Sequence, residues 1–369
     1  MAKKTKKPKV RGGKMHKKLF IPGPTEVREE ILEVLKTPMI GHRSKEFSVL
    51  YDSIVPKLKK VLYTDNKVFL STSSSTGLME AAVRNCVSKR ALNLACGAFS
   101  KRWHQITKSN GKDADMIEVE WGKAILPDMV RDALKTGKYD AVTFVHNETS
   151  TGVMNPIYEI AEVMKEFPDV SFLVDAVSSM AAVKIEVDKL GIDVCLAGVQ
   201  KAFALPPGLA VCSVSEKALK KAETVQNRGY YFDFLTFLKY DQDKHQTPTT
   251  PIISLIFALD KQLDRFFEEG LENRFARHLE MANYVREWTK KYFDFFAQEN
   301  YRSNTLTAVK NTRGISVTDL NKELGKRGAV ISNGYGKLKE TSFRIAHMGD
   351  LTLDEMKWLL SQINEIVGL

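Results

Sequence analysis

The stretch VFLSTSSSTGLMEAAVRNCVSK, residues 68–89, contains the pattern that decides the fold. Its apolar start is typical of a buried strand, and a run of hydroxyl residues and an amphipathic helix follow. Six further apolar runs have strand length, several of them apolar on both faces, as parallel strands covered by helices are. They are ALNLACG (91–97), MIEVEW (116–121), AVTFVH (141–146), SFLVDAV (171–177), VCLAG (194–198) and LAVCSVS (209–215). Helical patterns lie between them, so the sequence predicts an open, mostly parallel α/β sheet.

The pattern changes after Pro251, where long helical runs replace the alternation. This change predicts a second, smaller α+β domain. Helices are expected at 253–270, 272–296 and 352–369, and strands near 305–311, 329–334 and 342–347. We therefore expect a basic tail (1–18), a large α/β domain (19–265) whose segment 19–40 contacts the small domain or a partner, and a long helix with the small domain (266–369).

The net charge of +10 is concentrated at the N-terminus. Residues 1–18 hold eight Lys, one Arg and no acid, while the rest of the chain holds 46 basic and 45 acidic residues. Such a tail could contact nucleic-acid phosphates, but no nucleic-acid-binding motif or basic stripe accompanies it. It also lacks the apolar segment of a signal peptide. We interpret it as a solvated extension, whose presence depends on whether Met1 or Met15 is the start, and expect no nucleic-acid partner.

The remaining composition is that of a globular protein, with 43% apolar and 27% charged residues. No apolar stretch reaches the length of about 18 residues that a membrane span needs. We therefore expect a cytoplasmic protein that does not enter a membrane. The cysteines lie in or beside apolar segments without metal-ligand spacing, so we expect buried free thiols and no metal. They are Cys86, Cys96, Cys195 and Cys212.

Polar residues follow three of the apolar runs. Residues 71–77, STSSSTG, begin a predicted helix, where N–H groups and the helix dipole favour a phosphate, although Ser and Thr are also common caps. Asp175 ends an apolar run and needs a cationic partner if buried, unless it caps a helix. Lys201 lies in a segment nearly free of charge, where burial would lower its pKa; the alternative is a solvated surface Lys. Ligands bind at the carboxyl ends of such strands, so we expect these groups to lie together.

These three groups together match the needs of pyridoxal 5'-phosphate. That cofactor requires a Lys for a Schiff base, a carboxylate that keeps its pyridine nitrogen protonated, and a site for its phosphate. The three occur in this chain at three different strand ends. The sequence therefore predicts a pyridoxal-phosphate enzyme.

The chain resembles the class V (fold type I) pyridoxal-phosphate aminotransferases, in particular the alanine–glyoxylate and serine–pyruvate aminotransferase group. The resemblance extends from about Leu19 to the C-terminus. It is carried by PGPTEV (22–27), GHRSKEF (41–47), HNETSTGV (146–153), LVDAVSS (173–179), GVQKAFALPPGLA (198–210), QTPTTPIISL (246–255) and FRIAHMG (343–349). It implies a mostly parallel seven-stranded sheet between helices, a smaller α+β C-terminal domain, and a homodimer with shared active sites.

The resemblance also implies roles for single residues. Lys201 would form the Schiff base and shuttle the proton, and Asp175 would pair with the pyridine nitrogen. Phe99, where the group often has Trp, and Val177 would cover the two faces of the ring. Ser74, Ser75, Thr76 and Gln200 would bind the phosphate, Thr149 would lie near the ring hydroxyl, and Gln246 and Thr249 would reach the phosphate bound by the neighbouring subunit.

Substrate contacts are expected from further basic residues. Arg344 would bind the substrate carboxylate, and its planar guanidinium in the apolar run FRIAH suits bidentate carboxylate recognition. His42 and Arg43 could select anionic substrates or anchor the N-terminal segment. Arg228 and His347 are further polar candidates, with a structural role the better interpretation of His347.

The expected reaction is transamination from alanine or serine to a 2-oxo acid such as glyoxylate or pyruvate, with ping-pong kinetics. An anionic donor (phosphoserine, aspartate or aminoethylphosphonate) is the alternative, since Arg43 or Arg228 could meet a second negative group. A cysteine desulfurase is disfavoured, because no Cys follows Cys212 and Gln200 replaces the His that is usual in those enzymes.

Overall fold

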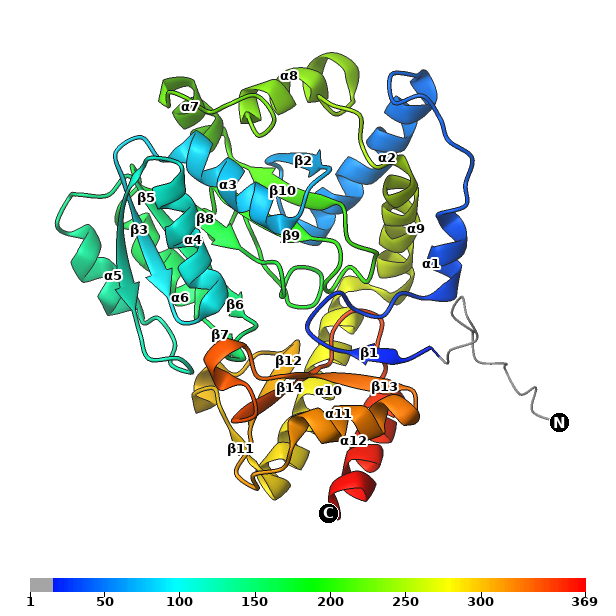
Figure 1. Ribbon diagram of the computed structural model, residues 1–369. Helices are drawn as coiled ribbons and strands as arrows, with labels where there is room; N and C mark the ends of the chain where they lie inside the picture. The colour runs from blue at the N-terminus through cyan, green and yellow to red at the C-terminus, as the bar shows by residue number, and fades with distance from the viewer. Residues whose placement is uncertain (1–15) are drawn as a thin grey trace.

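The computed structural model describes residues 16–369, so most of the predicted solvated tail, with Met15, lies outside the described residues. A seven-stranded sheet forms the centre of the molecule (Figure 1). Within it β10 runs antiparallel to both neighbours, and the other strands share one direction. In spatial order the strands are β2 (Lys67–Ser71), β10 (Ala210–Val214), β9 (Val194–Gly198), β8 (Ser171–Asp175), β5 (Ala141–Val145), β3 (Arg90–Ala95) and β4 (Asp113–Glu118). The predicted mostly parallel sheet is confirmed, although β4 lies three residues before the expected 116–121.

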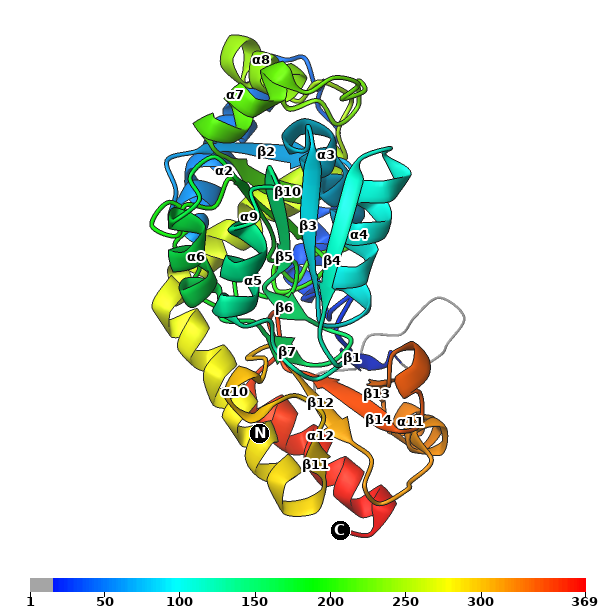
Figure 2. The same cartoon turned by 90° about the vertical axis from the view of Figure 1, so that its left-hand side faces the viewer.

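Helices cover both faces of this sheet, because the strands are apolar on both sides. Along β5, Val142 and Phe144 pack into one core cluster, and Ala141 and Val145 into the other. Figure 2 shows α4 on one side of the sheet and α5 and α6 on the other. The first cluster includes side chains of α1 (Glu29–Val34), α2 (Lys45–Leu62), α5 (Pro127–Leu134), α6 (Ile157–Lys165) and α9 (Ile253–Glu269). The second includes those of α3 (Ser75–Cys86), α4 (Ala98–Ser109), α7 (Glu216–Thr224) and α8 (Phe234–Lys244).

A smaller five-stranded sheet lies below the first in Figure 1. Its N-terminal strand pairs in parallel with β13, so the start of segment 19–40 contacts this part of the molecule. In spatial order the strands are β1 (Lys18–Phe20), β13 (Ala329–Asn333), β14 (Ser342–Ala346), β12 (Leu306–Lys310) and β11 (Asp294–Phe295). Its core also contains α10 (Leu271–Tyr292), α11 (Val317–Lys326) and α12 (Leu353–Val367).

The helical connection between the two sheets breaks at Gly270, whose φ of +82° is a conformation that glycine adopts readily. The expected division at 265/266 falls inside α9, and the domain boundary stays a prediction. The second helical run ends at Tyr292 instead of 296. Phe293 is extended and packs on Phe343, and the chain then pairs with β12 as β11.

The four cysteines are buried and free, as expected. Within residues 16–369, no helix combines the length and apolarity required to cross a membrane. The same residues contain no group of three or more His, Cys, Asp or Glu placed to hold a metal ion.

Candidate active site

A cavity of about 330 Å³ lies at the carboxyl ends of β2, β5, β8 and β9. This edge of a doubly wound sheet is where ligands bind. The structure brings nine of the residues predicted for the cofactor to its wall: Ser74, Ser75, Thr76, Phe99, Thr149, Asp175, Val177, Gln200 and Lys201.

The first strand end forms an anion site at the N-terminus of α3. Ser74 is the N-cap residue, but its side chain makes no capping hydrogen bond. The Ser75 hydroxyl is buried and has no hydrogen-bond partner among the described residues. A Cβ at position 198 would lie 2.3 Å from that hydroxyl, so Gly198 leaves the room that Ser75 and Gln200 occupy. In simple capping these hydroxyls would accept hydrogen bonds from the helix N–H groups. Because they do not, they remain available to a phosphate at the positive end of the helix dipole.

The second strand end is Asp175, a carboxylate that is only 5% exposed. Its Oδ1 accepts a hydrogen bond from the N–H of Val177 at 2.8 Å, and a turn rather than a helix follows, so it is not a helix cap. Burial raises the pKa of Asp175 to about 7, although the Val177 N–H and the charge of Lys201 act in the opposite direction. No basic residue within 16–369 forms an ion pair with it. The carboxylate is therefore free to pair with a cationic group of a ligand.

The third strand end is Lys201, which is buried and not a surface residue. Its Nζ donates a hydrogen bond to the backbone oxygen of Pro22. Gly23, with a φ of +138°, packs so closely that a Cβ there would lie 2.6 Å from this Nζ. Burial lowers the pKa of Lys201 to about 8; Asp175 opposes this shift and Arg344 adds to it. The site thus raises the fraction of the amine in its neutral, nucleophilic form.

Apolar groups flank these polar ones. Phe99 lies in the first turn of α4, and Val177 in the turn after β8, and both line the cavity. The Phe99 ring lies 5.3 Å from the Tyr335 ring, between centroids. These side chains can pack against a planar aromatic ring.

Arg344 lies in the middle of β14 and approaches the cavity from the small sheet. Its Nη1 donates to the backbone oxygen of Thr149 at 3.1 Å, and its Nε and Nη2 donate to that of Asn333 at 3.2 Å. Burial lowers the pKa of Arg344 to about 10. No carboxylate in the described part of the chain pairs with it. A buried guanidinium with no acidic partner fits the carboxylate of a ligand.

Four predicted residues do not line the cavity: Gln246, Thr249, Arg43 and Arg344, although Arg344 contacts Thr149 of the cavity wall. Arg43 donates from Nη1 to the backbone oxygen of Thr247 at 2.6 Å and from Nη2 to that of Pro248 at 2.7 Å. It therefore anchors the segment that contains Gln246 and Thr249. Selection of substrates by Arg43 is not supported, and the contact of that segment with a neighbouring subunit stays a prediction.

The other polar candidates also have structural partners. His42 Nε2 lies 3.3 Å from a Thr hydroxyl of the same segment. Arg228 pairs with Asp233 at 2.8 Å and donates to two backbone oxygens, so it is not free to meet a substrate. His347 is fully buried, and burial lowers its pKa to about 3, in agreement with the structural interpretation.

Several residues of the cavity wall were not predicted from the sequence. Arg102 is the most informative, because its guanidinium lies 4.9 Å from the Phe99 ring centroid and forms no ion pair with any acid of residues 16–369. Its spacing of three from Phe99 on one helix was a usable signal. Five others lie within the motifs that carry the family resemblance, which was a further signal: Gly23, Pro24, Asn147, Ser178 and Pro207. Met79 and Val145 lie in an apolar helix and an apolar strand, where nothing in the sequence distinguishes them from core residues.

The unsatisfied groups of this cavity match pyridoxal phosphate one by one. The orphaned Ser75 hydroxyl and the N-terminus of α3 fit a phosphate. Asp175 lacks a cation, which a protonated pyridine nitrogen supplies, and Lys201 offers an amine of lowered pKa. The residues present therefore fit the cofactor.

Comparisons with known proteins agree with this geometry. An uncharacterized aminotransferase of Methanocaldococcus jannaschii is 42% identical over 341 residues, covering 90% of this chain and 88% of that one. The L-aspartate–glyoxylate aminotransferase of Paracoccus denitrificans is 33% identical over 90% of this chain and 87% of its own length. The solved structure of an alanine–glyoxylate aminotransferase from Nostoc sp. superposes with a TM-score of 0.90 at 26% identity, covering 100% of this chain and 97% of that one.

A family profile places the chain among known enzymes. The profile described as Aminotransferase class-V matches residues 26–338, which include both Asp175 and Lys201. The fold, the fit of the cavity and this match lead to one conclusion: the chain belongs to the class-V aminotransferases, which are pyridoxal-phosphate-dependent transaminases.

Proposed function

We propose that this protein transfers the amino group of alanine or serine to a 2-oxo acid such as glyoxylate or pyruvate. One observation carries the proposal: the Lys201 amine, with a pKa of about 8, shares a cavity with Asp175 at the edge that Arg344 approaches. The solved alanine–glyoxylate aminotransferase is similar over the whole chain. A cavity of about 330 Å³ must hold both cofactor and substrate, which favours small substrates.

Each residue has a defined task in this reaction. Arg344 binds the carboxylate of the donor and later that of the acceptor, so both half-reactions use one site and ping-pong kinetics follow. When bound, pyridoxal phosphate supplies an electron sink for the pair left at the donor Cα. Lys201 Nζ removes the proton from that Cα, and Asp175 keeps the pyridine nitrogen protonated. Excluding water keeps these groups effective.

The remaining predicted residues would hold the cofactor. Phe99 and Val177, which line the cavity, would cover its ring, and Thr149 would lie near its ring hydroxyl. Ser74, Ser75, Thr76 and Gln200 of the same chain would bind its phosphate, together with Gln246 and Thr249 from a second copy in a homodimer.

The proposal is tested by the rate at which the cofactor absorbance decreases in a single turnover with each of a panel of amino donors. Alanine and serine should react faster than aspartate, phosphoserine and aminoethylphosphonate. Lys201→Ala should lower the rate by at least about 10⁴-fold, because both the covalent attachment and the proton transfer are lost. A Lys201→Ala protein with full activity would overturn the assignment.

An anionic donor such as aspartate is the second candidate, and Arg102 is the observation that favours it. This residue lines the cavity and has no acidic partner within 16–369, unlike Arg228. The relative from Paracoccus denitrificans is named for aspartate and glyoxylate. The Arg102 guanidinium in the cavity wall would meet the second carboxylate of such a donor.

Arg102→Met separates the two candidates, because it keeps the length of the side chain and removes its charge. If aspartate is the donor, kcat/KM for aspartate should fall about 100-fold while that for alanine changes little, as expected for a lost charged contact. Equal small changes for both donors would support alanine or serine. Phosphoserine in the same assay reports whether any dianion is accepted.

A further inference from the structure

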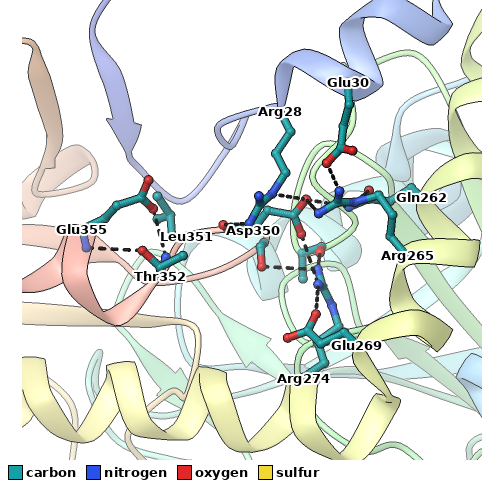
Figure 3. Close-up of polar contacts among 12 residues, drawn as sticks. Arg28, Glu30, Gln262, Arg265, Glu269, Arg274, Asp350, Leu351, Thr352 and Glu355 are labelled. Carbon is teal, nitrogen blue, oxygen red and sulfur yellow. Dashed lines mark hydrogen bonds and ion pairs between the residues drawn. The ribbon is translucent and has the colours of Figure 1, made fainter. Parts of the chain in front are cut away.

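Asp350 lies in the loop that follows β14, six residues after Arg344, and its side chain is 5% exposed. Four side chains from other segments surround its carboxylate (Figure 3). Arg28 comes from the N-terminal segment, with Nε at 3.3 Å, and Arg274 from α10, with Nη1 at 3.1 Å. Gln262 and Arg265 come from α9. The loop that continues the substrate-binding strand is thus tied to the rest of the molecule at this carboxylate.

Arg274 connects this carboxylate to the strand ends of the large sheet. Its side chain is 1% exposed, and it lies in the first turn of α10. Nη2 donates to the backbone oxygen of Ala202 at 2.7 Å, directly after Lys201, and Nε donates to that of Ala181 at 2.9 Å. Nη2 also lies 3.3 Å from the backbone oxygen of Gly349. One guanidinium therefore contacts the Lys201 loop and the Asp350 loop at the same time.

The N-terminal segment reinforces the same connection. Arg28 binds Asp350, and Thr25 of the same segment donates from its N–H to the backbone oxygen of Gln200 at 3.0 Å. The Thr25 hydroxyl donates to the backbone oxygen of Lys201 at 2.9 Å. Both carbonyls that flank the Lys201 side chain are therefore held by groups linked to Asp350.

We propose that the Arg274–Asp350 pair is a positioning device that sets the spacing between Lys201 and Arg344. The inference rests on the proposed function, in which these two residues act on one substrate from different sheets. Lys201 must reach the donor Cα while Arg344 holds the carboxylate attached to it. Misplacement by about 1 Å can cost about 100-fold in rate. A guanidinium suits this task because its planar, pre-organised donors fix several acceptors at once, which an ammonium group cannot do.

Arg277 provides a matched control on the same helix. Like Arg274, it pairs with Glu269 and donates to the backbone oxygen of Gly349, at 2.6 Å and 3.2 Å respectively. It makes no hydrogen bond to Ala202 or Ala181. Arg274→Lys therefore removes guanidinium contacts to the Lys201 loop, whereas Arg277→Lys leaves that loop untouched.

The experiment compares Arg274→Lys and Arg277→Lys by hydrogen exchange and by kinetics. Amides of residues 204 and 205, which donate within the Lys201 loop, should exchange about tenfold faster in Arg274→Lys and unchanged in Arg277→Lys. The kcat for the donor half-reaction should fall about 10- to 100-fold in Arg274→Lys, with a smaller change in KM, and less than about threefold in Arg277→Lys.

If Arg274→Lys does not fold, Asp350→Asn replaces it in the experiment, since the amide keeps the shape of the side chain and removes its charge. It should likewise speed the exchange of amides 204 and 205 and lower kcat. Equal effects of the two Arg→Lys changes, or a lowered melting temperature with unchanged loop exchange and kcat, would overturn the proposal. Hydrogen exchange is read in the protein with or without cofactor. An enzyme that proves inactive toward all donors would refute the proposed function, and the exchange comparison would still decide on the positioning pair.

Discussion

Burial penalises the charged forms of both Asp175 and Lys201. It raises the pKa of the Asp175 carboxyl and lowers that of the Lys201 amine, so the neutral form of each group gains. Such opposed shifts in one cavity are common at catalytic sites, where reactivity depends on groups that would be more stable in water. In our proposal, the protonated pyridine nitrogen of the cofactor would offset the cost of burying the Asp175 carboxylate. We therefore expect the ionised Asp175 carboxylate to destabilise the protein when the cofactor is absent.

Asp175→Asn should therefore raise the melting temperature of the cofactor-free protein at about pH 8 and abolish transamination. A carboxyl whose pKa rises from 3.8 to about 7 on folding binds its proton more tightly in the folded state. The protonated carboxyl therefore contributes to the free energy of unfolding below the unfolded-state pKa, and this contribution is lost as the pH rises toward 7. The amide should remove a penalty of about 4 kcal/mol at pH 8, and the difference should vanish toward about pH 4. Thermal unfolding across this range checks the sign; a variant less stable at pH 8 contradicts it.

The N-terminus of α3 differs from those of the other helices with a Ser or Thr N-cap, in which the hydroxyl caps the helix. In α11 the side chain of the N-cap Ser316 accepts a hydrogen bond from the N–H of Asp319 at 3.1 Å. In α3 neither Ser74 nor Ser75 uses its hydroxyl in this way. Local capping therefore stabilises α11, whereas α3 presents unused donors to the cavity.

Ser75→Ala should leave the free energy of unfolding of the cofactor-free protein almost unchanged and weaken cofactor binding about tenfold, the value of one hydrogen bond to a charged group. Ser316→Ala is the control: it should cost about 1 kcal/mol of stability and leave cofactor affinity unchanged. Denaturant unfolding and fluorescence titration with the cofactor measure the two quantities. Loss of stability without loss of affinity in Ser75→Ala would assign that hydroxyl a structural role.

The complete site draws on both sheets and, in our proposal, on two copies of the chain. Lys201 and Asp175 belong to the large sheet, and Arg344 to the small one. Gln246 and Thr249 do not line the cavity of their own chain, and Arg43 holds their segment in place. A homodimer would bring this segment to the phosphate of the other copy.

Mixing two inactive variants tests this sharing. A Lys201→Ala chain and a Gln246→Ala/Thr249→Ala chain should form hybrid dimers in which one site has Lys201 from one chain and intact Gln246 and Thr249 from the other. Each hybrid dimer should have about half the activity of a wild-type dimer, because one of its two sites is intact. Size-exclusion chromatography confirms the dimer. No recovery in a verified hybrid would show that the sites are not shared.

The seven strands of the large sheet were predictable because strand signals are local: short apolar runs and the turn residues between them. The same holds for the choice of Asp175 and Lys201, since each stands out against its neighbours. The end of α10 was not predictable, because Phe293 turns out of the helix to pack on Phe343, a residue distant in sequence.

Local patterns thus sufficed for the class of fold, the strand ends and the residue types of the chemistry. Tertiary packing decided what each basic residue contacts: Arg43 and Arg228 are used by nearby backbone, Arg344 donates to backbone oxygens of Thr149 and Asn333, and Arg102 lines the cavity without an ion pair to any acid of residues 16–369. It also placed Arg274 against the Lys201 loop. The physical reason is that a guanidinium's role depends on which acceptors lie within about 3 Å, and residues far apart in sequence supply those acceptors.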